Sequence, residues 1–211
     1  MPKKAKNKIA DAEKKLDKTK DIRLLVYTQP KKTLIGKKKP ELFEVAIGGS
    51  DVKAKFDYAK GMLGKPISVD AVFKDGMFMD THSVTTGKGF QGVVKRFGVK
   101  LRSHKSEKGQ RRIGTLGPWT PKKTPWWVPM SGQMGYHTRT DYNKQLLKIS
   151  EEDITPNGGL LRYGTVKNKY MLVRGSISGP KKRLITFTHA IRKHPAEEAP
   201  SVVAVSRRSQ Q

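Results

Sequence analysis

The stretch from Lys88 to Lys123 limits most strongly what this chain can fold into. It carries eleven basic residues, six glycines and a single acid, Glu107. So few apolar residues remain that burial cannot offset the cost of ordering the backbone, about 1–2 kcal/mol per residue. The stretch is therefore predicted to depend on a polyanion that neutralises its charge. RNA is such a polyanion, and its bases offer flat surfaces to the indole of Trp119.

Length and charge bound the possible classes of function. The chain has 211 residues, 44 of them basic and 18 acidic, for a formal net charge of +26. This length suits one domain with an extension, and the charge predicts nucleic acid as the partner. An anionic membrane is the weaker alternative, because we find no long apolar run, no strongly amphipathic basic helix and no signal peptide. The absence of cysteine excludes disulfides and thiolate chemistry and fits a cytoplasmic protein.

Apolar runs predict a mainly β fold with one short helix. Strands are predicted at residues 22–27, 42–47, 67–73, 77–80, 160–166, 170–177 and 184–191, whereas residues 145–149 fit a strand or a helix. Asp75-Gly76 lies between two of these runs and predicts a hairpin turn. Ser50 or Asp51 is expected to cap a helix that continues to about Leu63.

These elements divide the chain into four predicted parts. Residues 1–20 form a lysine-rich N-terminal tail, and residues 193–211 form a C-terminal tail. Residues 21–87 and 141–192 form a small β-rich body. Residues 88–140 form a long basic, non-globular extension that leaves this body and returns to it. Many short strands separated by glycine turns favour a closed or nearly closed β-barrel for the body.

Residues 87–92 match the pattern G-x-G-x-x-G. A dinucleotide site would need an amphipathic helix directly after the pattern, and the next residues do not predict one. The favoured interpretation is a backbone that approaches phosphates closely, beside the cations Lys88, Lys95 and Arg96.

No motif indicates catalysis or a bound cofactor. The five histidines show no zinc-ligand spacing, and no nucleophile stands beside a base and an orienting acid. An enzyme built on a small barrel, such as a flavin-dependent one, is the rival hypothesis without a supporting motif. We expect no enzyme, cofactor or metal. His137, between Tyr136 and Arg139, is expected to hydrogen-bond a base or a phosphate.

The tryptophans have neighbours that cannot enclose them. Prolines at 118, 121 and 125 stiffen an extended loop, with Trp119 at its tip. Stacking of this ring on RNA would contribute about 1–3 kcal/mol per base. For Trp126 and Trp127 two interpretations stay open, RNA contact and packing at the base of the loop.

The density of positive charge argues against a merely solvated face, because so many like charges would repel one another in an isolated fold. Arginines at 96, 102, 111, 112 and 139 are the better candidates for bidentate grips on phosphates or base edges. The predicted RNA-binding residues are Lys88, Lys95, Arg96, Lys100, Arg102, His104, Lys105, Lys108, Arg111, Arg112, Trp119, Lys122, Lys123, Trp126, Gln133, Tyr136, His137 and Arg139.

Three blocks carry a family resemblance: TTGKGFQGVVKRFGVK (85–100), RRIGTLGPWTP (111–121) and GQMGYHTRTDYNKQL (132–146). Together with residues 37–49 and 170–187 they closely resemble the universal third protein of the large ribosomal subunit, in its archaeal form. The resemblance implies a six-stranded barrel and an extension that runs through rRNA toward the peptidyl transferase centre, with Trp119 at its tip. It also implies a cytoplasmic, structural role in early subunit assembly, with large-subunit rRNA and neighbouring ribosomal proteins as partners. A transient RNA-binding assembly factor is the alternative.

The chain departs from the family pattern in two places. The lysine-rich lead-in runs directly into the middle of the pattern, without the N-terminal third that the family usually has. Either that third is a separate chain, or the protein is a trimmed form of the family. A body without those strands would expose unpaired edges, and our hypothesis is that a second polypeptide completes the barrel. Eukaryotic relatives carry a modified histidine near the position of Glu107, with His104 slightly upstream here, so that modification is not carried over to this chain.

Overall fold

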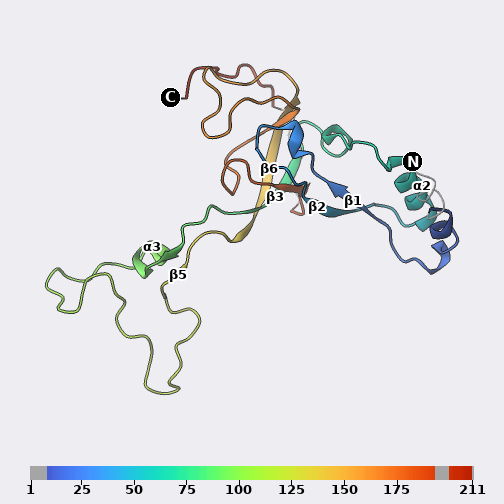
Figure 1. Ribbon diagram of the computed structural model, residues 1–211. Helices are drawn as coiled ribbons and strands as arrows, with labels where there is room; N and C mark the ends of the chain where they lie inside the picture. Colours follow the sequence, from blue (N-terminus) through green and yellow to red (C-terminus); the bar gives the residue numbers. More distant parts are fainter. Residues whose placement is uncertain (1–8, 193–199, 211) are drawn as a thin grey trace. The chain divides into compact units, whose positions relative to one another are not determined.

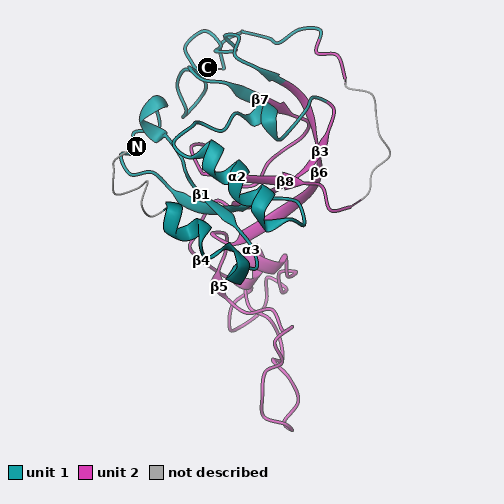
Figure 2. Ribbon diagram, turned by 90° about the vertical axis from the view of Figure 1, so that its right-hand side faces the viewer, with its two compact units in different colours: residues 1–75, 149–170, 203–211 teal, residues 76–148, 171–202 magenta. Residues whose placement is uncertain are grey.

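The computed structural model describes residues 9–192 and 200–210. Two compact units divide the chain, and Figure 2 colours them differently. Unit 1 comprises residues 1–75, 149–170 and 203–211, and unit 2 comprises residues 76–148 and 171–202. The tails predicted at 1–20 and 193–211 lie partly outside the described residues.

Unit 1 is built on a two-stranded antiparallel sheet. Strand β1 (Arg23–Tyr27) pairs with β2 (Leu42–Ala46), so that Arg23 lies opposite Ala46 and Tyr27 opposite Leu42. These strands confirm the predictions for residues 22–27 and 42–47. Residues 9–13 are helical, and short 3-10 turns lie at Leu16–Lys18 before β1, at Pro30–Lys32 between β1 and β2, and at Val69–Ala71.

The predicted short helix is confirmed as α2 (Val52–Met62), also in unit 1. Asp51 is its N-cap, since its carboxylate Oδ1 accepts a hydrogen bond from the backbone N–H of Lys53 at 3.0 Å. Such a cap satisfies one of the amide groups that a helix start leaves unpaired. Gly64 follows with φ +75°, a left-handed conformation that favours glycine and helps to end the helix.

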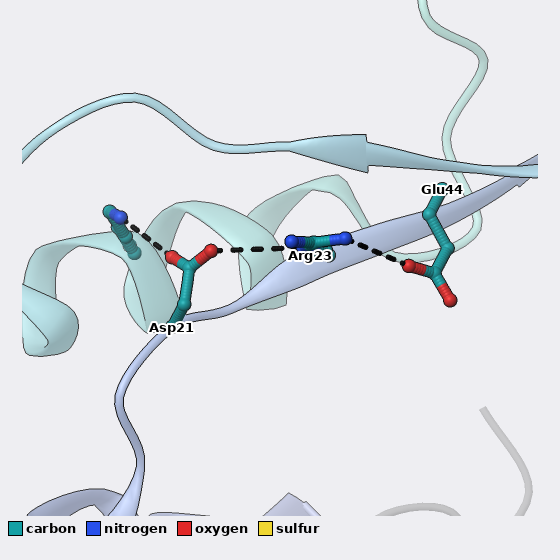
Figure 3. A network of polar contacts seen from close by, with 4 residues as sticks. Asp21, Arg23 and Glu44 are labelled. Atoms are coloured by element: carbon teal, nitrogen blue, oxygen red, sulfur yellow. Dashed lines mark hydrogen bonds and ion pairs between the residues drawn. The ribbon is translucent and has the colours of Figure 1, made fainter.

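A chain of ion pairs links α2 to both strands of this sheet (Figure 3). Lys55 Nζ lies 2.8 Å from Asp21 Oδ1, and Arg23 lies 3.8 Å from Asp21 and 3.4 Å from Glu44. The hydrogen bond from Lys55 is the main cause that lowers the pKa of Asp21, and the N–H of Ile22 adds to it. Because Asp21, Arg23 and Glu44 are exposed and only the side chain of Lys55, at 13%, is mostly covered, the network orients side chains more than it stabilises the fold.

A second exposed pair in unit 1 joins Asp70 to Lys169, whose Nζ also lies 3.5 Å from Glu151. The hydrogen bond from Lys169 lowers the pKa of Asp70 below its ordinary value of 3.8, and Ser68 adds to this. In return the Asp70 carboxylate raises the pKa of Lys169. A carboxyl group whose pKa is lowered by folding stabilises the fold when the pH is above its ordinary pKa. This contribution is lost as the pH falls through the lowered pKa.

Unit 2 contains most of a four-stranded sheet in the order β7–β6–β3–β8. The strands are β3 (Phe78–Val84), β6 (Thr138–Ser150), β7 (Tyr170–Val173) and β8 (Thr186–His189). Strand β3 is antiparallel to β6 on one side, with Val84 opposite Thr138, and antiparallel to β8 on the other. The ambiguous run at 145–149 therefore belongs to a strand, and the runs at 77–80, 170–177 and 184–191 each contain strand residues.

Three local predictions were wrong. Residues 67–73 contain a 3-10 turn, and residues 160–166 form only an isolated bridge between Leu160 and Gly164. Asp75-Gly76 is a turn but closes no hairpin, because β3 pairs with β6 and β8 instead. Residues distant in the sequence form hydrogen bonds with the polar groups of this turn. Asp75 Oδ1 accepts from the N–H of Ile149 at 2.9 Å, and the N–H of Gly76 donates to the carbonyl of Leu146 at 2.8 Å.

The fold is mainly β with few short helices, and the sheets of the described residues have two, four and two strands. None of these sheets closes into a barrel. The buried apolar side chains in this part of the chain are Phe73, Met79, Val93 and Leu146. So small a core offers little apolar burial to stabilise a chain of this length. No helix within residues 9–192 and 200–210 has the length and apolar character needed to cross a membrane.

Asp80 organises the centre of the unit 2 sheet. It lies at a bulge where the β3–β6 register shifts, and it is fully buried. Its Oδ1 accepts from the N–H of Asn143 at 2.9 Å, and its Oδ2 accepts from the N–H of Ile191 at 3.0 Å. Asn143 has φ +53°, so the carboxylate holds a bulged backbone in place.

We expect Asp80→Asn to lower the free energy of unfolding by about 2–4 kcal/mol, because the new amide NH₂ would face a buried backbone donor. The urea midpoint of the full chain, followed by far-ultraviolet circular dichroism at low micromolar concentration, measures this. Asp75→Asn is the control, since Asp75 is exposed and should cost under about 1 kcal/mol. Equal midpoint shifts for the two variants would contradict a structural role for Asp80.

Candidate nucleic-acid interface

Two runs of unit 2, residues 84–91 and 132–138, lie antiparallel and form what we call the neck. Backbone bonds of 2.9 Å join Thr85 N–H to His137 O, Lys88 N–H to Met134 O, and Met134 N–H to Gly89 O. Strands β4 (Phe90–Gln91) and β5 (Gly132–Gln133) continue this pairing. The neck therefore fixes both ends of residues 92–131, which Figure 1 draws as loops apart from one short helix.

Gly135 allows the two runs of the neck to approach each other. It has φ +70°, and a Cβ added there would lie 2.1 Å from the carbonyl oxygen of Thr86 and 3.1 Å from the nitrogen of Lys88. No side chain fits such a space, and the left-handed backbone disfavours other residues as well. The pairing of the neck thus requires glycine at this position.

Helix α3 (Val93–Phe97) follows the G-x-G-x-x-G pattern, where the sequence had predicted no helix. Its N-cap is Gly92, Val93 is buried, and Gly98 ends it with φ 67°. Burial of Val93 and the stop at Gly98 are enough to define a helix of five residues. A helix of this length is too short to show a helical period in the sequence. The helix is also too short for the dinucleotide-binding unit, which needs a full crossover helix.

Two of the predicted arginines brace the loops. Arg96 donates from Nη1 to Met130 O at 2.8 Å and from Nε to Gln133 O at 3.1 Å. Arg102 donates from its side chain to Ile113 O, and its backbone N–H donates to Gln110 O at 3.1 Å. A guanidinium has five N–H donors, so each arginine keeps donors for a further acceptor.

The other predicted cations are exposed. They are Lys88, Lys95, Lys100, Lys105, Lys108, Arg111, Arg112, Lys122, Lys123 and Arg139, together with His104. Among the described residues, none of the lysines and arginines between 88 and 139 forms an ion pair with a carboxylate. The positive charge of residues 88–139 is therefore not neutralised within the protein.

The three tryptophans are also exposed to solvent. Trp119, Trp126 and Trp127 have 83%, 91% and 67% of their surface accessible. Trp126 and Trp127 contact each other edge to face at 5.9 Å, and Lys122 Nζ lies 5.3 Å from the ring centre of Trp119. Packing at the base of the loop does not bury the pair in the protein. Three exposed indoles among cations provide surfaces on which bases can stack.

The neck contains a hollow of about 580 Å³. Its lining includes five predicted residues: Lys88, Arg96, Gln133, His137 and Arg139. Sequence patterns did not indicate its other residues, which are Thr85, Thr86, Phe97, Met134, Gly135 and Gly179. His137 is held across the neck by a hydrogen bond, which its backbone N–H donates to Thr85 Oγ1 at 3.2 Å. The neck thus gathers residues that lie far apart in the sequence.

Arg183 is a further residue of this region that no sequence pattern indicated. Its guanidinium lies 5.5 Å from the ring centre of Tyr136, and Nη1 donates to Val84 O at 3.4 Å. The guanidinium of Arg192 likewise lies 4.1 Å from the ring centre of Tyr142. Spacing along the chain gives no signal for such long-range pairs. Within the described residues there is no cluster of three or more histidine or acidic side chains that could hold a metal ion.

Comparison with known proteins gives a consistent result. A family model described as ribosomal protein L3 matches residues 2–208. The large ribosomal subunit protein uL3 of Methanocaldococcus jannaschii is 48% identical over 217 aligned residues, which cover the whole chain and 65% of that relative. The protein of the same name from Methanococcus vannielii is 50% identical over 93% of the chain and 60% of its own length. The chain thus spans about 60–65% of these curated relatives.

Proposed function

Because the chain belongs to the ribosomal protein L3 family, we propose that it is a structural constituent of the large ribosomal subunit and binds the rRNA of that subunit. The observation that carries this proposal is the set of exposed cations between residues 88 and 139, which no carboxylate neutralises in the described part of the chain. The phosphates of RNA supply the negative charge that neutralises such cations. Phosphate contacts position a protein without reading the base sequence. The role is architectural and not enzymatic, and it places the protein in cytoplasmic ribosomes.

The finer parts of the proposal follow the family. Residues 21–87 and 141–192 form the barrel body, and residues 88–140 penetrate the rRNA toward the peptidyl transferase centre. Trp119, exposed and flanked by Lys122, is the tip that stacks on RNA. In this role the protein joins assembly early, beside neighbouring ribosomal proteins.

Sedimentation of a cell lysate at low and high salt, with mass spectrometry of the large-subunit fraction, tests the proposal. Stoichiometric presence in mature subunits at both salt concentrations is expected. Presence only in immature particles, or loss at high salt, would instead favour the transient assembly factor. Absence from ribosomal particles would refute both roles.

The sheet of unit 1 supports a proposal about a protein partner. Leu25, Tyr27 and Leu42 lie on one face of the β1–β2 ribbon and are 67%, 61% and 64% exposed. The ribbon has two strands only, so both of its edges lack a strand partner among the described residues. We propose that a β-rich polypeptide, supplied by a separate chain, covers this face and completes the barrel.

Leu25→Thr combined with Leu42→Thr should at least halve the fluorescence of a bound apolar dye and reduce self-association of the free chain. Dye titration and analytical ultracentrifugation measure the two effects. Leu34→Thr combined with Leu63→Thr is the matched control, since both leucines are exposed but lie outside the ribbon. A free wild-type chain that binds no dye and stays monomeric at every concentration would argue against a covering polypeptide.

A further inference from the structure

The hollow in the neck has a one-sided chemistry. Lys88, Arg96 and Arg139 bring three cationic groups to it from the first run of the neck, from α3 and from β6. No aspartate or glutamate lines it. Such a lining disfavours a cation and favours a ligand with at least one negative charge.

The remaining lining is suited to a flat, partly apolar group. Phe97 is exposed, and the guanidinium of Arg96 lies 5.0 Å from its ring centre. Met134 adds a polarisable thioether, and Thr85 and Thr86 add hydroxyl groups. The ring nitrogen Nε2 of His137 makes only a long contact, 3.4 Å, with Gln133 O. Stacking surfaces beside hydrogen-bonding groups are what an unstacked base requires.

The size of the hollow fits a single nucleotide. Its volume of about 580 Å³ falls in the range of pockets that hold one small organic molecule, about 300–1,000 Å³. Its walls are held by the backbone bonds of the neck and by the two bonds from Arg96 to Met130 and Gln133. Because these bonds are internal, the hollow is formed before any ligand arrives.

We propose that this hollow holds one unpaired nucleotide of the rRNA, its phosphate against Lys88 and Arg139 and its base against Phe97. This inference rests on the proposed function, since it assumes that rRNA is the partner. It adds a defined site at the root of the basic loops, distinct from the phosphate contacts of the loops themselves. An acidic side chain of a neighbouring protein is the alternative occupant.

A photo-crosslinking residue at position 97 tests the inference in assembled large subunits. The full chain carrying p-azidophenylalanine in place of Phe97 is incorporated and irradiated, and rRNA crosslinks are mapped by reverse-transcription stops. We expect one dominant stop at an unpaired nucleotide. The same probe in place of Phe90, which is exposed but does not line the hollow, is the control and should not give that stop.

Charge variants then test the assignment of the phosphate. In the background with the probe at 97, Lys88→Met or Arg139→Gln should reduce the dominant crosslink at least fivefold, measured per chain incorporated into the subunit. Lys38→Met, an exposed lysine of unit 1 that lies outside both the hollow and the predicted RNA-binding residues, should leave it unchanged.

The remaining outcomes separate the two hypotheses. Crosslinking to a protein, or no RNA crosslink in fully occupied subunits, would overturn the inference and leave the proposed function intact. Crosslinks spread over many nucleotides would also overturn it. Failure of the chain to enter subunits at all, including the wild type, would instead refute the proposed function.

Discussion

Gly135→Ala is expected to open the neck and to cost more than about 4 kcal/mol in local stability. The new Cβ would lie 2.1 Å from the carbonyl oxygen of Thr86, a distance that real contacts do not show, and backbone atoms cannot yield as a flexible side chain can. The bonds of Thr85, Lys88 and Met134 across the neck depend on this approach. Amide hydrogen exchange of residues 84–91 and 132–138, followed by mass spectrometry, measures the loss of protection.

Gly89→Ala provides the matched control. Gly89 lies in the same neck with nearly the same conformation, φ +69°, but a Cβ there would meet no atom within 4 Å. This variant should cost only the left-handed backbone penalty, about 1–2 kcal/mol. The difference between the two variants isolates the steric contact from the backbone strain. Similar exchange in both would show that the neck tolerates a wider separation.

Removing four loop cations together is expected to weaken rRNA binding by on the order of 10²–10³-fold near physiological salt. Lys100, Lys105, Lys108 and Arg111 are suited to this test, because they are exposed and do not brace the backbone as Arg96 and Arg102 do. Changing all four to Gln should also reduce the slope of log K against log salt by roughly 3 to 4. Filter binding of the full chain to large-subunit rRNA across a salt series measures both quantities.

The control variant removes the same charge from unit 1. Lys31, Lys38, Lys39 and Lys65 are exposed too, and their change to Gln lowers the net charge equally. If the loop cations contact phosphates, the control should lose much less affinity and keep most of the salt slope. Equal losses would mean that net charge alone attracts the RNA and that the loop has no special role.

Sequence patterns correctly predicted the elements that are determined by residues close together in the sequence. Helix α2 has a capping aspartate and a helical apolar period, and β1 and β2 are short apolar runs between breakers. Strand β6 was recognised only in part, because residues 138–144 are polar and are held in the sheet by pairing with β3. The turn at Asp75-Gly76 shows the opposite case, where a strong local signal yields to distant partners such as Leu146.

The character of the candidate site was predictable, but its geometry was not. Charge density and the tryptophans indicated an RNA-facing segment, and the structure leaves the tryptophans and most of these cations exposed, with no carboxylate partner for the cations among the described residues. The bracing role of Arg96, the stacking of Arg183 on Tyr136 and the buried Asp80 all depend on residues distant in sequence. Composition carries no information about such pairs.

The neck also determines how the basic segment can meet folded RNA. Residues 92–131 are fixed at both ends, so the segment inserts as a folded-back pair of runs and no free end has to be threaded. Closing a loop of 40 residues costs about 3 kcal/mol in chain entropy, and the neck bonds offset this cost within the protein. RNA can therefore condense around a loop that is already closed, or the loop can enter a gap that has already formed, without either polymer becoming entangled.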